Sequence, residues 1–434
     1  MTGLAAGMAS GFLVLEASAN PGGICSSYYM VPGSNTRHST RLCGGSYRFE
    51  LGGGHWIFGG DPMIRTFLQK TVPICEYRRK SSVYFAKTNQ FIPYPIQDHL
   101  SFLDPQTSDK VNRDIGLATG SGSTMREWLV NTFGRTLCEM FFFPFHEKYT
   151  AGLYHEIAPQ DLQKSVVPRQ QGTTNDNKNR GYNPTYLYPD SGLDVLARRM
   201  AEHCHIQYDS CVTSLDVSRR EIILANNKRL RYDILISTLP LTSLLTMCGL
   251  VTEMRADPYT SVLVLNIGAR KGLRYPAEHW LYTPDAVSGF HRVGFYTNVS
   301  PSFAPQNAED GHARVGLYVE SAYRAGVRPS PAEQNAYETS VIAELREWGF
   351  ITDVEVVDAT WIDIAYTWSW PGSQWRKTAL ALLQGHGIYP VGRYGRWAFQ
   401  GIAESIKEGF FNGAAARLMS SSLNHDDCDS LAGS

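Results

Sequence analysis

The sequence predicts an α/β protein in which a parallel strand and helix unit is joined to a largely helical segment and an antiparallel sheet. Three patterns indicate this. The apolar run 12–15 ends in Glu16 and precedes the glycine pair 22–23, which is typical of a strand followed by a tight turn. Residues 124–148 have a helical pattern, and residues 261–323 contain alternating apolar strands. The chain is therefore expected to combine both kinds of sheet.

The N-terminal stretch fits a Rossmann-type dinucleotide-binding unit with an apparently truncated first strand. In a complete unit, glycines let the backbone approach a pyrophosphate at a helix N-terminus, and a carboxylate after the second strand binds the adenosine ribose. Gly3 fits the last glycine of that fingerprint, residues 4–10 the helix and Glu16 the ribose acceptor. The spacing from Gly3 to Glu16 is shorter than the usual distance of about twenty residues. In the chain as written, the loop that would hold the pyrophosphate is half absent, so weak or absent cofactor occupancy is expected.

Two other interpretations of this stretch stay open. Residues 12–15 could form a plain core strand with a turn after it. Alternatively, the apolar residues 4–15 and the small residues 17–19 resemble a secretory leader with its cleavage site. Against the leader, no Lys or Arg precedes the apolar run, and Glu16 places a charge at its end.

Composition and charge exclude several classes of function. The chain has 434 residues, with 40 basic and 41 acidic side chains, so nucleic acid is not an expected partner. No apolar run reaches the roughly twenty residues that span a bilayer. The eight cysteines form no CxxC pair, so no zinc or other metal site is predicted. Scattered single thiols are typical of a reducing compartment, and a cytoplasmic location is expected.

Two further glycine-rich turns are candidates for cofactor contact. Glycines 52–54 precede His55, and their lack of side chains would let a flat group lie on the backbone. Gly392 and Arg393 follow a short strand and precede a helix expected over 401–418, where a phosphate or an electron-rich ring could bind. A glycine hinge with a core histidine and a plain strand-to-helix corner are the alternatives.

Other segments are expected to shape a substrate pocket. Residues 81–91 predict a strand pair, and the two prolines in residues 92–97 predict an extended segment outside the ladder. Thr124 and Glu127 predict a capping box. The polar stretch 169–183 is either a loop that closes over substrate or a solvated insertion. Further helices are expected over 193–203 and 331–348.

Taken together, these motifs resemble the amine oxidase and protoporphyrinogen oxidase superfamily of FAD proteins, and within it the UDP-galactopyranose mutases. The resemblance runs from residue 1 to about residue 413. It depends on the order and spacing of Glu16, the glycine motifs and several short segments, which are YPIQ at 94–97, EWL at 127–129, FPF at 143–145, HWLYTP at 279–284, FHR at 290–292 and GRYGRW at 392–397.

The resemblance implies a reduced FAD whose N5 atom acts as a nucleophile on the anomeric carbon of a nucleotide sugar. Arg292 and Lys164 then match the cations that hold the diphosphate, and Tyr282 and Tyr366 match tyrosines that bind its oxygens. Gln97 matches a uridine contact. His55 and Arg393 match residues beside the flavin and are counted with Arg292 and Lys164 as catalytic. The implied cofactor contacts are Gly3, Glu16, Gly22, Gly23, Gly53, Gly54, Val212, Gly392, Arg393 and Ser405.

The resemblance also implies domain limits. The FAD-binding domain is expected over residues 1–80, 190–255 and 380–420, the helical segment over 81–189, the substrate sheet over 256–379 and a flexible tail over 421–434.

Some positions depart from the pattern of the mutases. Phe399 replaces a tyrosine, Gly401 or Ile402 replaces an asparagine, and Lys164 lacks the bidentate fork of arginine. An oxidase or desaturase acting on an apolar or amine substrate is therefore the alternative, and a poorly active truncated relative is the third hypothesis. Arg292 as an ordinary ion-pair arginine and Tyr366 as a packing residue also stay open.

Overall fold

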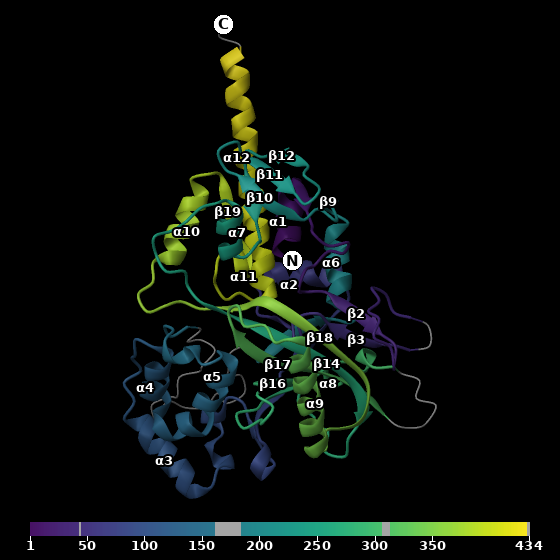
Figure 1. The fold of residues 1–434 in the computed structure, drawn as a ribbon, viewed down its shortest axis with the longest axis vertical. Coiled ribbons are helices and arrows are strands. Elements are labelled where there is room, and N and C mark those ends of the chain that lie inside the picture. The colour runs from purple at the N-terminus through teal and green to yellow at the C-terminus, as the bar shows by residue number, and fades with distance from the viewer. Residues whose placement is uncertain (43–44, 161–183, 306–312, 432–434) are drawn as a thin grey trace.

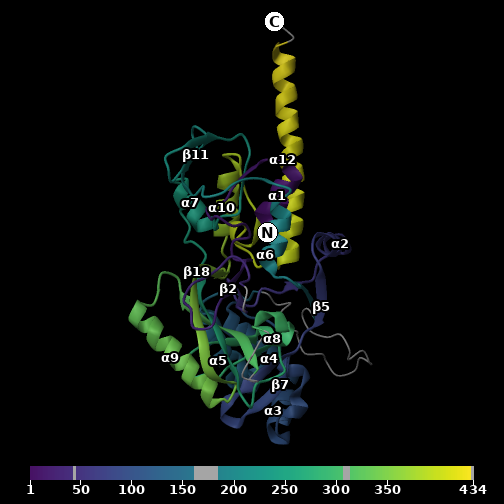
Figure 2. The same ribbon diagram turned by 90° about the vertical axis from the view of Figure 1, so that its right-hand side faces the viewer.

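The computed structural model describes residues 1–42, 45–160, 184–305 and 313–431, with side chains up to residue 422. It confirms the predicted mixed fold. The N-terminal residues, the C-terminal helix and two parallel strand pairs form one part of the molecule (Figure 1). A long antiparallel sheet and a group of helices form the rest (Figures 1 and 2).

The first part is built around helix α1 (Thr2–Ser10), which covers the expected helix 4–10. Strand β1 (Leu13–Leu15) pairs in parallel with β9 (His205–Gln207), and β13 (Leu235–Ser237) pairs in parallel with β19 (Ile388–Pro390). The surrounding elements are α6 (Leu193–Ala201), β10 (Val212–Asp216), β11 (Glu221–Leu224), β12 (Arg229–Arg231), α7 (Leu241–Met247), α10 (Trp375–Gln384), α11 (Gly392–Gly395) and α12 (Ile402–Leu431).

Glycines allow α1 to pack closely on its neighbours. A Cβ added at Gly409 or Gly413 of α12 would lie 2.3 Å from Thr2 O or 2.4 Å from Ala6 O of α1. A Cβ at Gly7 of α1 would lie 2.6 Å from Val14 Cγ2 of β1. Close backbone approach of this kind excludes any side chain, so these glycines fix the position of α1 between strand and helix.

The predicted antiparallel sheet is confirmed and has seven strands in the order β18, β14, β17, β16, β15, β6 and β7. The pairing is antiparallel except between β15 and β6. The strands are β6 (Ser81–Phe85), β7 (Gln90–Pro93), β14 (Tyr259–Lys271), β15 (Trp280–Tyr282), β16 (Arg292–Phe295), β17 (Arg314–Arg324) and β18 (Ile351–Thr367). The expected strand pair 81–91 therefore belongs to this sheet and not to the helical segment.

The helical segment contains α3 (Pro105–Gly116), α4 (Met125–Leu137) and α5 (Phe143–Tyr149). The capping box of Thr124 and Glu127 is present at the start of α4. The single helix expected over 124–148 is wrong, because Gly134 has a φ of 76° and a π-helical turn, Cys138–Phe142, precedes α5.

Two other expectations need correction. Residues 92–97 were expected outside any ladder, yet β7 pairs with β6 through Pro93, and a short 3-10 helix, Ile96–Asp98, follows. Helix α12 continues to Leu431, beyond the expected end at 418, so most of the expected C-terminal tail is helical. The polar stretch 169–183 lies outside the described residues.

The remaining elements connect these parts. They are β2 (Ser27–Met30), β3 (Tyr47–Glu50), β4 (Ile57–Phe58), α2 (Pro62–Thr71), β5 (Ile74–Arg78), β8 (Thr185–Pro189), α8 (Tyr296–Val299) and α9 (Pro331–Glu347). Among the helices that the structure describes, none combines the length and the hydropathy needed to cross a bilayer.

Candidate functional site

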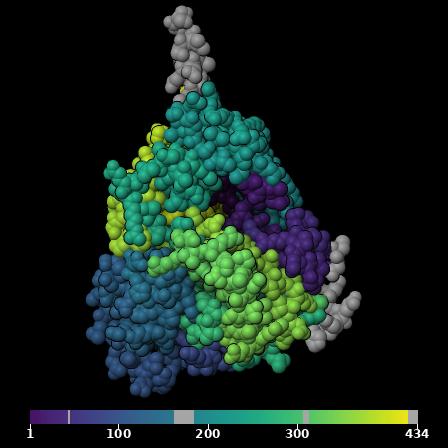
Figure 3. All heavy atoms as spheres, in the orientation of Figure 1, coloured from purple at the N-terminus to yellow at the C-terminus, as the bar shows by residue number. Residues whose placement is uncertain are grey.

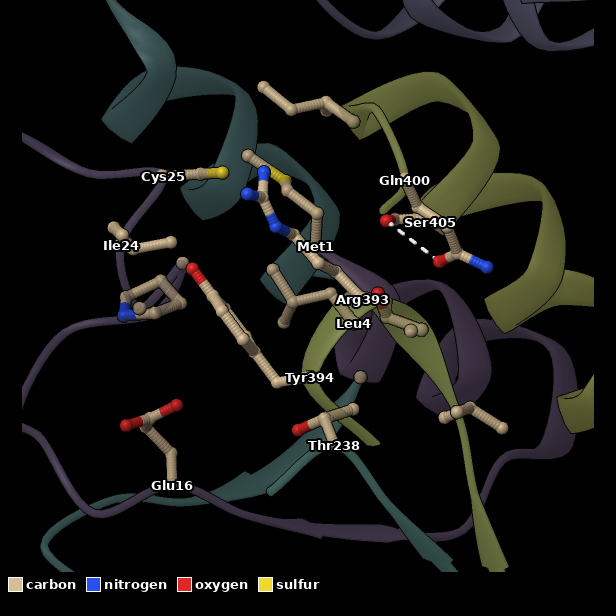
Figure 4. Close-up of a pocket in the computed structure, with 18 of the residues that line it drawn as sticks. Met1, Leu4, Glu16, Ile24, Cys25, Thr238, Arg393, Tyr394, Gln400 and Ser405 are labelled. Carbon is tan, nitrogen blue, oxygen red and sulfur yellow. Dashed lines mark hydrogen bonds between the residues drawn. The ribbon is translucent and has the colours of Figure 1, made fainter. Parts of the chain in front are cut away.

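A cavity of about 270 Å³ opens at the N-terminus of α1. The molecular surface is hollowed beside the N-terminal residues (Figure 3). Glu16, at the end of β1, lies on one side of the cavity, and Gln400 and Ser405 lie on the other (Figure 4). The expected cofactor residues that line it are Gly3, Glu16, Gly22, Gly23, His55, Gly392, Arg393 and Ser405.

Two of these glycines lie where no side chain fits. Gly22 has a φ of +108°, and a Cβ there would lie 2.8 Å from Cys25 O. Gly392 has a φ of +76°, and a Cβ there would lie 2.6 Å from Thr2 Oγ1. Both therefore keep the backbone bare at the cavity wall, as a phosphate cradle requires.

Charge at the cavity suits an anionic group. No side chain caps the N-terminus of α1, so its first backbone N–H groups and its dipole favour negative charge there. The Arg393 guanidinium adds a cation. Its Nη2 donates to Ala365 O at 2.9 Å, whereas its buried Nε has no hydrogen-bond acceptor among the described residues.

His55 is a partly buried histidine whose buried Nδ1 atom is unused. Its Nδ1 has no hydrogen-bond partner among the described residues, and the ring packs against the backbone of Gly52. Burial lowers the pKa of His55 to about 4, with a further contribution from Arg393, so the imidazole is neutral at pH 7. A neutral ring can either donate or accept one hydrogen bond at the free nitrogen. The unused nitrogens of His55 and Arg393 and the bare glycines therefore fit a dinucleotide cofactor.

Changing Gly392 to alanine should lower the amount of flavin that copurifies with the protein. The new Cβ would meet Thr2 at the start of α1, and the positive φ adds roughly 1–2 kcal/mol of strain. Absorbance of flavin released on denaturation, divided by protein concentration, measures the effect. Gly116→Ala, whose Cβ would have no atom within 4 Å and which is not among the described residues that line either cavity, is the control. Equal flavin content in both variants would contradict the prediction.

A second cavity lies between the helical segment and the seven-stranded sheet. Gly54, Tyr282, Arg292 and Tyr366 line it, and Gly401 lines both cavities. The second cavity is strongly aromatic, with Trp56, Phe58, Tyr94, Phe141, Phe142, Phe145, Tyr149, Trp280, Tyr282, Tyr366, Trp368 and Phe399 in its wall.

Arg393, in the wall of the first cavity, contacts two aromatic residues in the wall of the second. Its guanidinium carbon lies 5.2 Å from the ring centre of Tyr366 and 4.7 Å from that of Phe399. Cation–π contact of this kind stabilises the arginine by about 0.5–2 kcal/mol. Burial raises the pKa of Tyr366 to about 12, so its hydroxyl stays protonated and can donate to an anion. A cofactor in the first cavity and a substrate in the second would therefore meet beside Arg393.

Arg292 forms an ion pair with Glu320 at the second cavity. Its Nη2 lies 2.5 Å from Glu320 Oε2 and its Nε donates to the same oxygen at 3.0 Å. Burial alone would raise the pKa of Glu320, but the Arg292 charge outweighs it and holds this pKa at about 2. His291 also lies near the carboxylate, with Nε2 3.5 Å from the same Glu320 Oε2. Arg292 is thus a paired cation on the cavity wall.

The importance of Glu320 was missed from the sequence. It lies opposite Arg292 in the register of β16 and β17, and its side chain is 2% exposed. A lone carboxylate in the apolar strand 315–322 is the signal that could have found it, because a buried acid in a sheet needs a cationic partner.

The remaining predicted residues lie elsewhere. Val212 starts β10 and packs with the cluster around Leu241, away from the described walls of both cavities. Gly53 lies behind the second cavity, where a Cβ would be 2.9 Å from Glu320 Oε1. Gln97 is buried in the 3-10 helix after β7 and is not among the described residues that line either cavity. Lys164 lies outside the described residues.

The bare glycines, the helix N-terminus and the acidic strand end make the first cavity a candidate nucleotide-cofactor site, and the aromatic cavity beside it is a candidate substrate site. This is the arrangement of a cofactor-dependent enzyme. The chain belongs to the family described as flavin containing amine oxidoreductase, which matches residues 4–414.

Solved structures share the fold. A reduced UDP-galactopyranose mutase superposes with a TM-score of 0.78 at 19% identity, covering 97% of this chain and 92% of that chain. A CLA-producing fatty acid isomerase from P. acnes has a TM-score of 0.57 at 14% identity, covering 94% and 95%. A putrescine oxidase bound to putrescine has a TM-score of 0.56 at 14% identity, covering 96% of both chains. At these identities the likeness concerns the fold.

Proposed function

We propose that this protein is an FAD-dependent mutase that isomerises the sugar ring of a nucleotide sugar. The observation that supports it best is the gathering of Tyr282, Arg292 and Tyr366 at one cavity, where the Tyr366 ring also contacts Arg393 of the first cavity. The likeness in fold to UDP-galactopyranose mutase, with the higher TM-score among the three comparisons given above, adds support. Lys164 is a proposed second cation for the diphosphate.

In this proposal the first cavity holds FAD. The α1 N-terminus and the glycines Gly3, Gly22 and Gly392 would hold the pyrophosphate, and Glu16 the adenosine ribose. When bound in its reduced form, FAD supplies a nucleophile for the anomeric carbon of the sugar. The neutral His55 ring would orient the cofactor through its free nitrogen, because an uncharged imidazole can act as donor or acceptor there.

The second cavity would hold the nucleotide sugar. Arg292 offers a guanidinium to the diphosphate, while Tyr282 and Tyr366 offer hydroxyl groups to its oxygens. The aromatic walls exclude water, which strengthens these interactions and suppresses hydrolysis. The Glu320 carboxylate neutralises most of the positive charge of Arg292, so the pair is nearly neutral before substrate binds. The tyrosine hydroxyls therefore carry much of the recognition of the leaving group.

The domain division follows from the same proposal. We propose that residues 1–80, 190–255 and 380–420 bind the cofactor, and that the sheet within 256–379 carries the substrate residues. Strands β6 and β7 extend that sheet into the segment 81–189.

The direct test is isomerisation of a nucleotide sugar. Purified protein supplied with FAD and reduced with dithionite is offered UDP-galactopyranose and UDP-galactofuranose, and products are separated by liquid chromatography. We expect interconversion under reducing conditions, and a loss of about tenfold or more in the Tyr282→Phe variant, because a hydrogen bond to a charged group contributes about 1.5–3 kcal/mol. Absence of both turnover and UDP binding by flavin-loaded protein would refute the proposal.

A second candidate function is oxidation of an apolar or amine substrate. The aromatic lining of the second cavity favours it, as does Phe399, which contributes no hydroxyl beside Arg393. Oxygen consumption or flavin bleaching with candidate amines, in the absence of dithionite, distinguishes this activity from isomerisation.

A further inference from the structure

The loop between β15 and β16, residues 283–291, carries candidate substrate residues at both ends. Tyr282 is the last residue of β15, and Arg292 is the first residue of β16. The loop closes on itself, since Thr283 N donates to His291 O at 3.1 Å and Thr283 Oγ1 donates to Phe290 O at 3.2 Å. The loop therefore joins the strand ends that carry Tyr282 and Arg292 and bears directly on their position.

Lys148 of α5 holds the loop from one side. Its Nζ donates to the carbonyl oxygens of Thr283 at 3.2 Å, Pro284 at 2.7 Å and Ala286 at 2.8 Å. An ammonium group has three hydrogens, so all of its donors are used on one loop. No carboxylate takes part in these hydrogen bonds. The Lys148 ammonium group therefore binds backbone carbonyl oxygens, and these three contacts are not an ordinary ion pair.

Glu344 of α9 holds the same loop from another side. Its Oε1 accepts from Val287 N at 2.7 Å and its Oε2 accepts from Ser288 N at 2.8 Å. Glu344 is 4% exposed, although it lies on a helix whose polar residues are mostly at the surface. A buried carboxylate that accepts backbone N–H groups is satisfied without a cation. The Lys148 ammonium group thus binds carbonyl groups of the loop, and the Glu344 carboxylate binds N–H groups of the same loop.

The α5 end of this arrangement belongs to the substrate cavity. Phe145, His146 and Tyr149 of α5 line the cavity on either side of Lys148 in sequence. Tyr149 and Tyr366 are in ring contact, with centroids 4.8 Å apart. The hydrogen bonds of Lys148 therefore connect α5, which lines the cavity, to the loop whose two ends carry Tyr282 and Arg292.

We propose that Lys148 and Glu344 are positioning residues, which hold the loop 283–291 between α5 and α9 and so fix Tyr282 and Arg292 at the substrate cavity. The proposal rests on the proposed function only in taking UDP as the ligand that reports on it.

The protonation of Lys148 offers an independent readout. Burial lowers the pKa of Lys148 to about 8, against the opposing influence of Asp285 in the loop and Glu344 on α9. His291 on the β16 side also faces this charge. Above about pH 8 the neutral amine has only two hydrogens for three carbonyls. Because this pKa lies below the ordinary lysine value of 10.5, a rise in pH above 8 nevertheless stabilises the state in which Lys148 stays on the loop, so the loop should be protected more strongly at pH 9 than at pH 7.

The test compares the Lys148→Met variant with the Lys110→Met variant, in which an exposed lysine of α3 is changed. Hydrogen exchange of the full chain is measured by mass spectrometry at pH 7 and pH 9, and UDP binding by calorimetry. In Lys148→Met we expect at least about tenfold faster exchange confined to residues 283–291 and about tenfold weaker UDP binding, with unchanged flavin content. In the wild-type protein, loop protection corrected for the intrinsic pH dependence of exchange should rise between pH 7 and pH 9, whereas that of the variant should not change.

Unaltered exchange of the loop in Lys148→Met would overturn the proposal, as would faster exchange spread evenly over the whole chain. If Lys148→Met does not fold, the Glu344→Gln variant tests the contact between α9 and the same loop. Faster exchange confined to residues 283–291 is expected in this variant too. Failure of the wild-type protein to bind UDP would count against the proposed function alone, because loop exchange and its pH dependence need no ligand.

Discussion

Replacing Arg292 with methionine is expected to lower the free energy of unfolding by about 3–5 kcal/mol and to weaken UDP binding at least about tenfold. Methionine retains much of the apolar stem but leaves the Glu320 carboxylate, 2% exposed, without its cation. A buried charge that loses its partner costs more than the pair contributes, because its desolvation is no longer offset. Urea denaturation and UDP titration measure the two effects.

The pH dependence of stability should change sign in this variant. In the wild-type protein the pKa of Glu320 is lowered to about 2, so its stabilising contribution is present above the ordinary pKa of 4.5 and is lost as the pH falls from 4.5 to 2. Without Arg292, burial dominates and the pKa of Glu320 rises. The variant should then become less stable as the pH rises above 4.5, because folding would require proton uptake.

The double variant Arg292→Met/Glu320→Gln is the control. Glutamine has nearly the shape of glutamate and no charge, so most of the lost stability should return, while UDP binding stays weak. A loss below about 1 kcal/mol in Arg292→Met would contradict the assignment of this pair as a buried one.

Local patterns predicted much of the fold. The strand alternation in 261–323 and the capping box at Thr124 depend on neighbours in sequence, and both are found in the structure. The helix expected over 124–148 was broken by Gly134, whose Cβ would lie 2.3 Å from Asp114 Cβ. That contact joins α3 to α4, and a single-sequence pattern contains no information about it.

The candidate site was predictable to a similar extent. Glu16, Gly22 and Arg393 belong to motifs with a recognisable spacing, and all three line the first cavity. Glu320 and Lys148 follow no motif, because their partners are brought to them by strand register and by helix packing. Val212 packs against a core cluster, and its expected contact with the cofactor stays a prediction.

The close packing of α1 on α12 leads to the second large effect. Changing both Gly409 and Gly413 to alanine should lower the free energy of unfolding by about 2–4 kcal/mol, although alanine favours a helix by up to about 1 kcal/mol per site. Each added Cβ would lie within 2.4 Å of a backbone oxygen of α1, which no side-chain rotation can relieve. Because α1 forms one wall of the first cavity, its displacement should also reduce flavin retention. Gly116→Ala, with no atom within 4 Å of the new Cβ, is the matched control and should keep or raise stability. If the double variant is as stable as this control, α1 does not depend on the close approach to α12, and the first cavity must be held open by other contacts.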